Sequence, residues 1–196
     1  GEGRNYFVRF WRLMAEAVVG HPSAVAVESM NEPMSIRRTD MYDTWVSVAK
    51  AVTAIVPDMS VSLSDSGQAA LLPAYVTQHA SQGAGLLVST EALDFIKKSN
   101  NLFYAWHWYG APSDVNKAVE NALAVGADWN VPTFATEFMD CGVWKACQEK
   151  GISHSYWHYS CYCDTGSYFG NKQMPEETFG ACILGWAAGT SEYTCE

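Results

Sequence analysis

Apolar and polar positions along the chain alternate between helical spacing and short apolar runs. A first helix is predicted over 5–19, where the apolar residues follow helical spacing. Further helices are predicted over 40–56, 71–79, 91–98, 113–125, 144–150 and 176–188. Buried strands are predicted over 24–27, 59–63, 102–106, 131–136 and 152–157. This regular alternation is typical of an α/β fold, a parallel sheet covered by helices.

Chemically distinctive side chains come directly after these strands. They are Glu32, Asp65, His107, Tyr109, Glu137 and Trp157. In parallel α/β folds, ligands bind at the edge formed by the carboxyl ends of the strands. The sequence therefore predicts one site, built from five strands, in a single domain that spans 1–196.

Composition excludes several classes of partner. The net charge of −9, from 12 basic and 21 acidic residues, argues against nucleic acid and anionic membranes. No apolar stretch approaches the roughly 20 residues of a membrane span. The chain has no Gly-rich phosphate loop and no C-x-x-C pair, so we expect neither a cofactor nor a metal. Oligomeric state is left open.

Six cysteines bear on the compartment of the protein. An even count favours disulfides and a secreted or extracellular protein, whereas six reduced thiols are the alternative. Sequence alone does not choose among the 15 possible pairings. The chain begins at Gly1 without Met or a signal peptide, so we expect a processed or truncated start.

Two glutamates suggest glycosidic chemistry. Glu32 lies in Asn31-Glu32-Pro33, and Pro33 is expected to hold it in extended geometry. Glu137 ends an almost wholly apolar run, where a carboxylate is costly unless it is paired or used. A retaining glycosidase needs two such carboxyl groups, one to protonate the leaving oxygen and one to attack the sugar. The alternatives are a simple turn at Glu32 and a salt-bridged Glu137.

Aromatic and imidazole groups surround this pair in the sequence. Strand alternation points His107 and Tyr109 to the same side, where Tyr109 could donate a hydrogen bond to Glu137. His107 could bind substrate or tune a neighbour, or it could be purely structural. Of the eight tryptophans, position favours Trp106, Trp108 and Trp157 as sugar-stacking rings, and burial in the core is the alternative.

These pieces resemble glycoside hydrolase family 5, in the clan of (β/α)8 retaining glycosidases. The matching motifs are Asn31-Glu32-Pro33, His107-Trp108-Tyr109, Thr136-Glu137-Phe138 and Tyr156-Trp157-His158-Tyr159. They come in the order expected for barrel strands 4, 6, 7 and 8. The resemblance implies an incomplete (β/α)8 TIM barrel with about strands 4 to 8, the C-terminal portion of the domain.

The resemblance also implies roles. Glu32 becomes the acid/base and Glu137 the nucleophile of a cellulase-like enzyme that cleaves β-glycosidic bonds in a polysaccharide or glycoconjugate. Asn31, His107, Tyr109 and Trp157 become substrate-binding residues. An Arg and a His expected on earlier strands are absent, which leaves the activity of this chain alone in question. A non-catalytic sugar-binding barrel or an inactive fragment of such an enzyme is one alternative, and an unrelated doubly wound α/β protein is another.

Overall fold

The computed structural model describes residues 1–33, 38–64, 88–109, 112–138 and 141–155. These ranges all belong to the first of two compact units, which spans residues 1–155. Asp65, Trp157, and the helices predicted over 71–79 and 176–188 lie outside the described residues.

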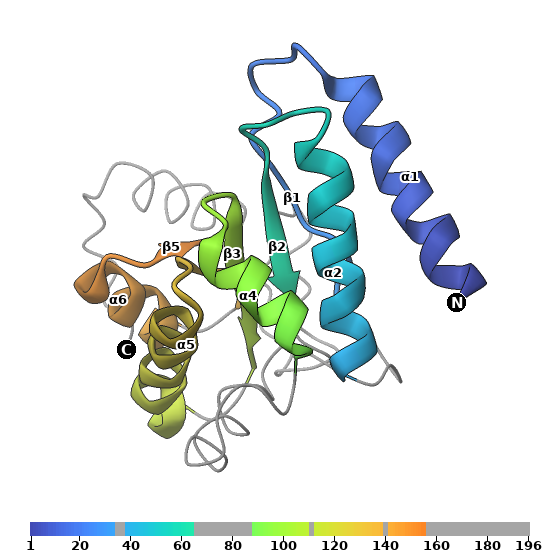
Figure 1. Cartoon of the computed structure of the whole chain (residues 1–196). Helices are drawn as coiled ribbons and strands as arrows, with labels where there is room; N and C mark the ends of the chain where they lie inside the picture. Colours follow the sequence, from blue (N-terminus) through green and yellow to red (C-terminus); the bar gives the residue numbers. More distant parts are fainter. Residues whose placement is uncertain (34–37, 65–87, 110–111, 139–140, 156–196) are drawn as a thin grey trace, which may run out of the picture. The chain divides into compact units, whose positions relative to one another are not determined.

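The five described strands form one parallel sheet in chain order (Figure 1). The strands are β1 (Ala26–Val27), β2 (Ser60–Ser64), β3 (Leu102–Trp108), β4 (Thr133–Phe138) and β5 (Ser153–His154). The predicted parallel sheet is confirmed, with each strand close to its expected place. β3 and β4 run two residues further than predicted because Trp108 still pairs with Phe138. His107 and Glu137 therefore lie within strands rather than just beyond them.

Helices connect these strands. They are α1 (Glu2–Val18), α2 (Arg38–Thr53), α4 (Thr90–Lys98), the 3-10 helix η3 (Pro112–Asp114), α5 (Val115–Trp129) and α6 (Cys141–Lys150). Helix α2 begins at Arg38, two residues before the predicted start at 40. Helix α5 begins at Val115, two residues after the predicted start at 113, because η3 precedes it. Among the described helices, none has the length and apolar character needed to cross a bilayer.

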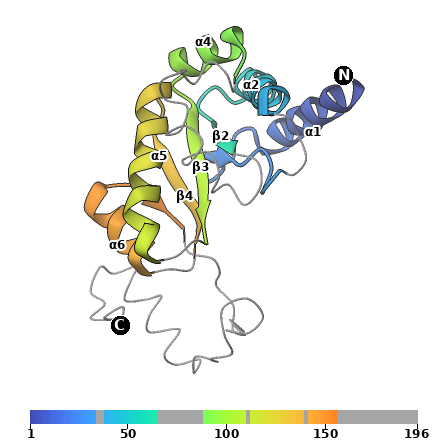
Figure 2. The same cartoon turned by 90° about the horizontal axis from the view of Figure 1, so that it is seen from below.

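Neighbouring helices pack against one another in chain order. Contacts run from α1 to α2, then to α4, α5 and α6, while α2, α5 and α6 also contact strands (Figure 2). The local sequence accounts for several of the helix ends. Ser89 caps α4 by accepting a hydrogen bond from the Ala92 amide, and Asn130 ends α5 in the left-handed conformation. Gly151 has a positive φ of 66° where α6 ends.

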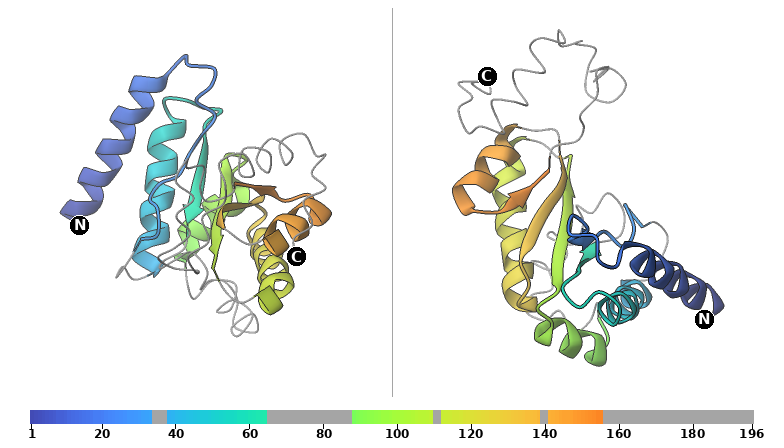
Figure 3. Two further views of the ribbon diagram at one scale, coloured as in Figure 1. Left: turned by 180° about the vertical axis from the view of Figure 1, so that it is seen from behind. Right: turned by 90° about the horizontal axis from the view of Figure 1, so that it is seen from above.

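Helix α1 lies beside α2, toward the β1 edge of the sheet (Figures 1 and 3). Phe7 packs against Trp45 of α2, with ring centroids 5.7 Å apart. The single predicted apolar face is only partly buried, because Phe10 and Met14 are 51% and 42% exposed. Tyr6 and Leu13 add further exposed apolar area to this helix.

Aromatic side chains fill the layer between sheet and helices. Tyr42 of α2 and Tyr104 of β3 both pack in T-shaped geometry against Trp129, at ring-centroid distances of 5.0 and 6.1 Å. Trp106 is 1% exposed and belongs to this core. The expectation that Trp106 lines a sugar cleft is therefore wrong, because strand alternation turns it away from His107.

Cys147 of α6 is a fully buried, unpaired thiol. Burial raises the pKa of this thiol to about 11, because the apolar surroundings disfavour the thiolate. With one of six cysteines free, the chain cannot pair all of them with one another. Cys147 thus gives no support to an oxidising compartment.

Candidate active site

Acidic side chains follow β1 closely in the sequence. Glu28 comes directly after the strand, and Glu32 follows four residues later. Two indole groups from the helices hold this edge of the sheet. Trp11 donates to the Ser29 carbonyl at 3.0 Å, and Trp45 donates to the Ser64 carbonyl at 2.8 Å. These bonds fix the backbone next to Glu28 and at the end of β2.

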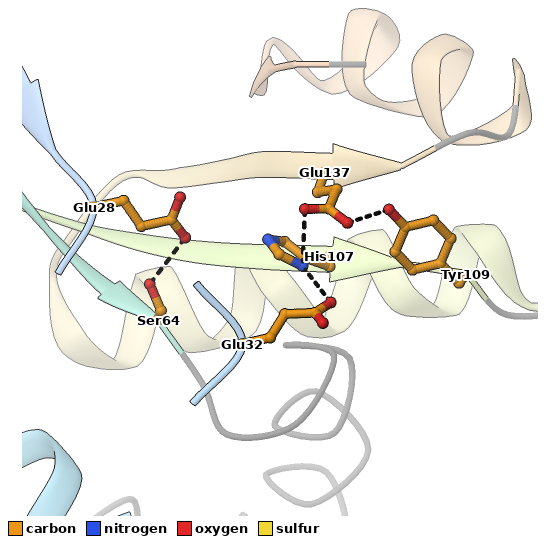
Figure 4. A network of polar contacts seen from close by, with 6 residues as sticks. All are labelled: Glu28, Glu32, Ser64, His107, Tyr109 and Glu137. Atoms are coloured by element: carbon orange, nitrogen blue, oxygen red, sulfur yellow. Dashed lines mark hydrogen bonds and ion pairs between the residues drawn. The ribbon is translucent and has the colours of Figure 1, made fainter. Parts of the chain in front are cut away.

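Glu32 has an uncommon backbone conformation, with φ at 41°. The predicted extended geometry before Pro33 is wrong, since positive φ belongs to the left-handed region. A non-glycine residue there costs on the order of 1–3 kcal/mol and persists only where its surroundings enforce it. The Glu32 carboxylate lies 2.9 Å from His107 Nδ1, which anchors the side chain on β3 (Figure 4).

A bulge in β4 brings Glu137 to the same side as His107. Phe134 shares a face with Phe103, so simple alternation would turn Glu137 to the opposite face. The register instead moves from Trp106 opposite Ala135 to His107 opposite Glu137. Thr136 is the extra residue, and β4 accordingly has two partly exposed positions between buried Ala135 and Phe138.

Tyr109 donates its hydroxyl hydrogen bond to Glu137 Oε1, as the sequence predicts. Figure 4 shows the two side chains meeting alongside the C-terminal end of β3. A hydroxyl donor fixes the orientation of the carboxylate that it contacts.

The His107 imidazole lies between the two catalytic candidates. Its Nδ1 is 2.9 Å from Glu32 Oε1 and 3.7 Å from Glu137 Oε2. One imidazole nitrogen of His107 and one carboxylate oxygen of each glutamate all lie within 4.8 Å of one another. The His107 side chain is only 2% exposed, whereas that of Glu32 is 29% and that of Glu137 is 13% exposed. Water thus reaches Glu32 more freely than Glu137.

Glu28 is a third carboxyl group in this network (Figure 4). It accepts a hydrogen bond of 3.2 Å from the Ser64 hydroxyl at the end of β2. Burial raises the pKa of Glu28, and the negative charges of Glu137 and Glu32 act in the same direction. His107 and the Ser64 hydrogen bond oppose this rise in pKa.

The structure brings together four of the residues expected at the site: Glu32, His107, Tyr109 and Glu137. Asn31 precedes Glu32 with an exposed side chain, and Trp157 lies outside the described residues. Sequence reasoning missed Glu28. Its signal was an acidic residue directly after the Ala26–Val27 run, the same type of position that drew attention to the other candidates.

Comparison with known proteins identifies the family. The model of the cellulase family (glycosyl hydrolase family 5) matches residues 2–165. The chain belongs to glycosyl hydrolase family 5. A search of curated protein sequences gives no significant match.

Solved structures agree on the fold. A hyperthermophilic endo-β-1,4-glucanase in complex with substrate is 16% identical, with a TM-score of 0.64, 94% of this chain covered and 66% of that chain. A β-glucanase from Saccharophagus degradans in complex with cellotetraose is 14% identical, with a TM-score of 0.62 and coverages of 96% and 61%. The catalytic domain of a Thermobifida fusca endoglucanase is 16% identical, with a TM-score of 0.58 and coverages of 93% and 64%.

These comparisons confirm the predicted fold class. Five parallel strands in chain order, with helices between them, correspond to part of a (β/α)8 TIM barrel. The chain spans between 61% and 66% of the length of these three solved structures.

Proposed function

We propose that this family 5 chain carries the catalytic pair of a retaining β-glycosidase. The observation that supports this most strongly is the approach of Glu32 to Glu137. A carboxylate oxygen of one lies within 4.8 Å of a carboxylate oxygen of the other. Retaining enzymes separate their carboxyl groups by roughly 5–5.5 Å, whereas inverting enzymes leave roughly 6.5–9.5 Å for a water molecule. The close spacing favours direct attack by one carboxylate on the sugar.

The local environments support a role for each glutamate. Glu137 is the less exposed and accepts the Tyr109 hydrogen bond, which suits a nucleophile that must be ionised and oriented. Glu32 is the more exposed and can exchange its proton with solvent, which suits an acid/base. His107 contacts Glu32 and lies near Glu137, so it can keep both carboxyl groups in place.

The proposed reaction has two steps. Glu137 forms a bond to the anomeric carbon while the glycosidic bond breaks, and the proton on Glu32 passes to the leaving oxygen. In the second step Glu32 removes a proton from water, whose oxygen displaces Glu137 from the anomeric carbon. Two displacements at one carbon restore its original configuration. We assign to Asn31 the binding of a sugar hydroxyl, and to Trp157 the ring beneath the reacting sugar.

A β-linked glucan is the substrate class that we propose. Two of the similar solved structures are described with a glucan-type activity and a bound substrate or cellotetraose. We also propose that residues 156–196 belong to the same barrel domain as 1–155, and that the protein acts outside the cell, where polymeric glucans occur.

A mechanism-based label tests this function. A 2-deoxy-2-fluoro β-glucoside with a good leaving group should form a lasting bond to Glu137, because the fluorine slows the second step. Mass spectrometry of the naturally produced protein should find the added sugar on the peptide that contains Glu137. Glu137→Gln should take up no label, while Glu149→Gln, at an exposed position on α6, should be labelled like the wild type.

A label on a different carboxylate would remove Glu137 as the nucleophile. Binding of a cello-oligosaccharide without labelling or hydrolysis would instead identify a non-catalytic sugar-binding barrel.

A further inference from the structure

A directional chain of hydrogen bonds ends on Glu28. The Ser29 amide can only donate, and it donates to Ser62 Oγ at 2.9 Å. Ser62 and Ser64 are joined through their hydroxyl oxygens at 3.1 Å, and the Ser64 hydroxyl donates to Glu28 Oε1 at 3.2 Å. Because the Ser64 proton is used on Glu28, Ser62 must donate to Ser64. Each of these two hydroxyl groups thus directs its hydrogen toward Glu28.

These serines are buried deeply. Ser29, Ser62 and Ser64 are between 0% and 2% exposed, although serine is usually a surface residue. Buried hydroxyl groups are costly unless all their hydrogen bonds are made. The Ser29 hydroxyl is satisfied by the Ser62 carbonyl at 3.2 Å, whereas the Ser62 and Ser64 hydroxyls are directed toward Glu28. Two buried hydroxyl groups directed to one carboxyl group indicate that the position of this carboxyl group matters.

Glu28 faces the His107 imidazole from the side opposite Tyr109 (Figure 4). His107 Nδ1 points to Glu32 and Glu137, so its other ring nitrogen lies on the side of Glu28. In the described part of the chain, the charged groups that act on Glu28 are His107, Glu32 and Glu137. The imidazole is therefore surrounded by three carboxyl groups.

We propose that Glu28 is a positioning residue that sets the upper pH limit of the glycosidase activity through its charge beside His107 and the catalytic pair. This inference rests on the proposed function above. Glu28 does not reach the reacting atoms in our scheme. It acts on the groups that do.

The direction of the expected pH shift follows from the ionisation of Glu28. Burial raises the pKa of Glu28, so the group keeps its proton at low pH and becomes an anion as the pH rises. The anion adds negative charge beside the acid/base, which then holds its catalytic proton to higher pH. Glutamine resembles protonated glutamic acid in shape and charge, so Glu28→Gln should differ from the wild type only on the alkaline side.

The experiment is the pH profile of kcat/KM for the naturally produced protein and its Glu28→Gln variant. We expect the alkaline limb to move to lower pH by about 0.5–1 pH unit. The acid limb should remain within about 0.2 pH unit, and KM at the pH optimum should stay within about twofold. Glu120→Gln, on the exposed side of α5, is the matched control and should leave both limbs unchanged.

A second variant tests the same role of Glu28 even if the Glu28→Gln protein fails to fold. Ser64→Ala keeps the carboxyl group but removes the donor that lowers the pKa of Glu28. Glu28 then ionises at higher pH, and the alkaline limb should shift in the same direction by a smaller amount. A purely structural role would lower kcat by the same factor at every pH.

Two results would overturn the role of Glu28: alkaline limbs that coincide with the wild type in both variants, or a uniform loss at all pH values. The same preparations are first tested with the fluoroglycoside. If Glu137 takes up the label and the pH profiles do not move, only the role of Glu28 fails. If no label forms, the proposed function fails.

Discussion

Glu32 and Glu137 are the same amino acid in different surroundings. Glu32 lies on a strained loop with φ at 41° and contacts one ring nitrogen, whereas Glu137 lies on a strand and accepts from Tyr109. Such differences allow two carboxyl groups to take different roles at one pH. The Tyr109 hydrogen bond is the contact that most directly distinguishes them.

Removal of the Tyr109 hydroxyl should therefore impair chemistry more than folding. We expect Tyr109→Phe to lower kcat by about 10- to 100-fold, because hydrogen bonds to charged groups contribute about 1.5–3 kcal/mol. Steady-state kinetics and thermal unfolding of the same samples measure the two effects.

Tyr6→Phe is the matched control. Tyr6 also donates to a glutamate, Glu2, but at 64% exposure on α1. Equal activity of the two Phe variants would show that the bond to Glu137 has no part in catalysis.

At the level of elements, the apolar pattern allowed the parallel sheet to be predicted, while the order of its strands was implied by the family resemblance. Apolar runs such as 102–106 alternate with segments of helical spacing, and few fold classes other than a parallel α/β sheet show this alternation. The bulge at Thr136 could not be predicted, because period-two alternation gives no signal for an extra residue. Glu137 was found through its isolation in an apolar run, although its orientation depends on that bulge.

Glu28 was missed for a related physical reason. Its partners Ser62 and Ser64 lie on the next strand, and their contact exists only after β1 and β2 pair. The backbone of Glu32 was also mispredicted, since a tertiary contact with His107 accompanies a φ value that local preference disfavours.

The junction of α5 and β4 offers a test of packing behind the site. A Cβ atom on Gly126 would lie 2.8 Å from the Val131 carbonyl oxygen, at the turn that leads into β4. We expect Gly126→Ala to destabilise the protein by about 1–3 kcal/mol, because the backbone must shift. Urea unfolding measures the change.

Gly3→Ala serves as its control. Gly3 lies within α1, and a Cβ atom there would meet nothing within 4 Å, so alanine should leave stability unchanged or raise it by up to about 1 kcal/mol. Similar unfolding midpoints for the two variants would contradict the close approach of α5 to β4.

At the scale of the whole molecule, the candidate site combines chain segments that are far apart. Glu32 follows β1, His107 lies on β3 and Glu137 lies on β4, so no single β/α unit holds both of the proposed catalytic residues. Pairing of parallel strands in chain order brings them to one edge. The proposed retaining chemistry depends on this convergence, and its outcome can be read in the product.

The stereochemistry of hydrolysis is the most direct test of the proposed retaining mechanism. Proton NMR can follow the naturally produced protein as it cleaves a cello-oligosaccharide, before the new reducing end mutarotates. Two displacements at the anomeric carbon predict that the β-anomer appears first. First appearance of the α-anomer would contradict the retaining mechanism and the assignment of Glu137 as its nucleophile.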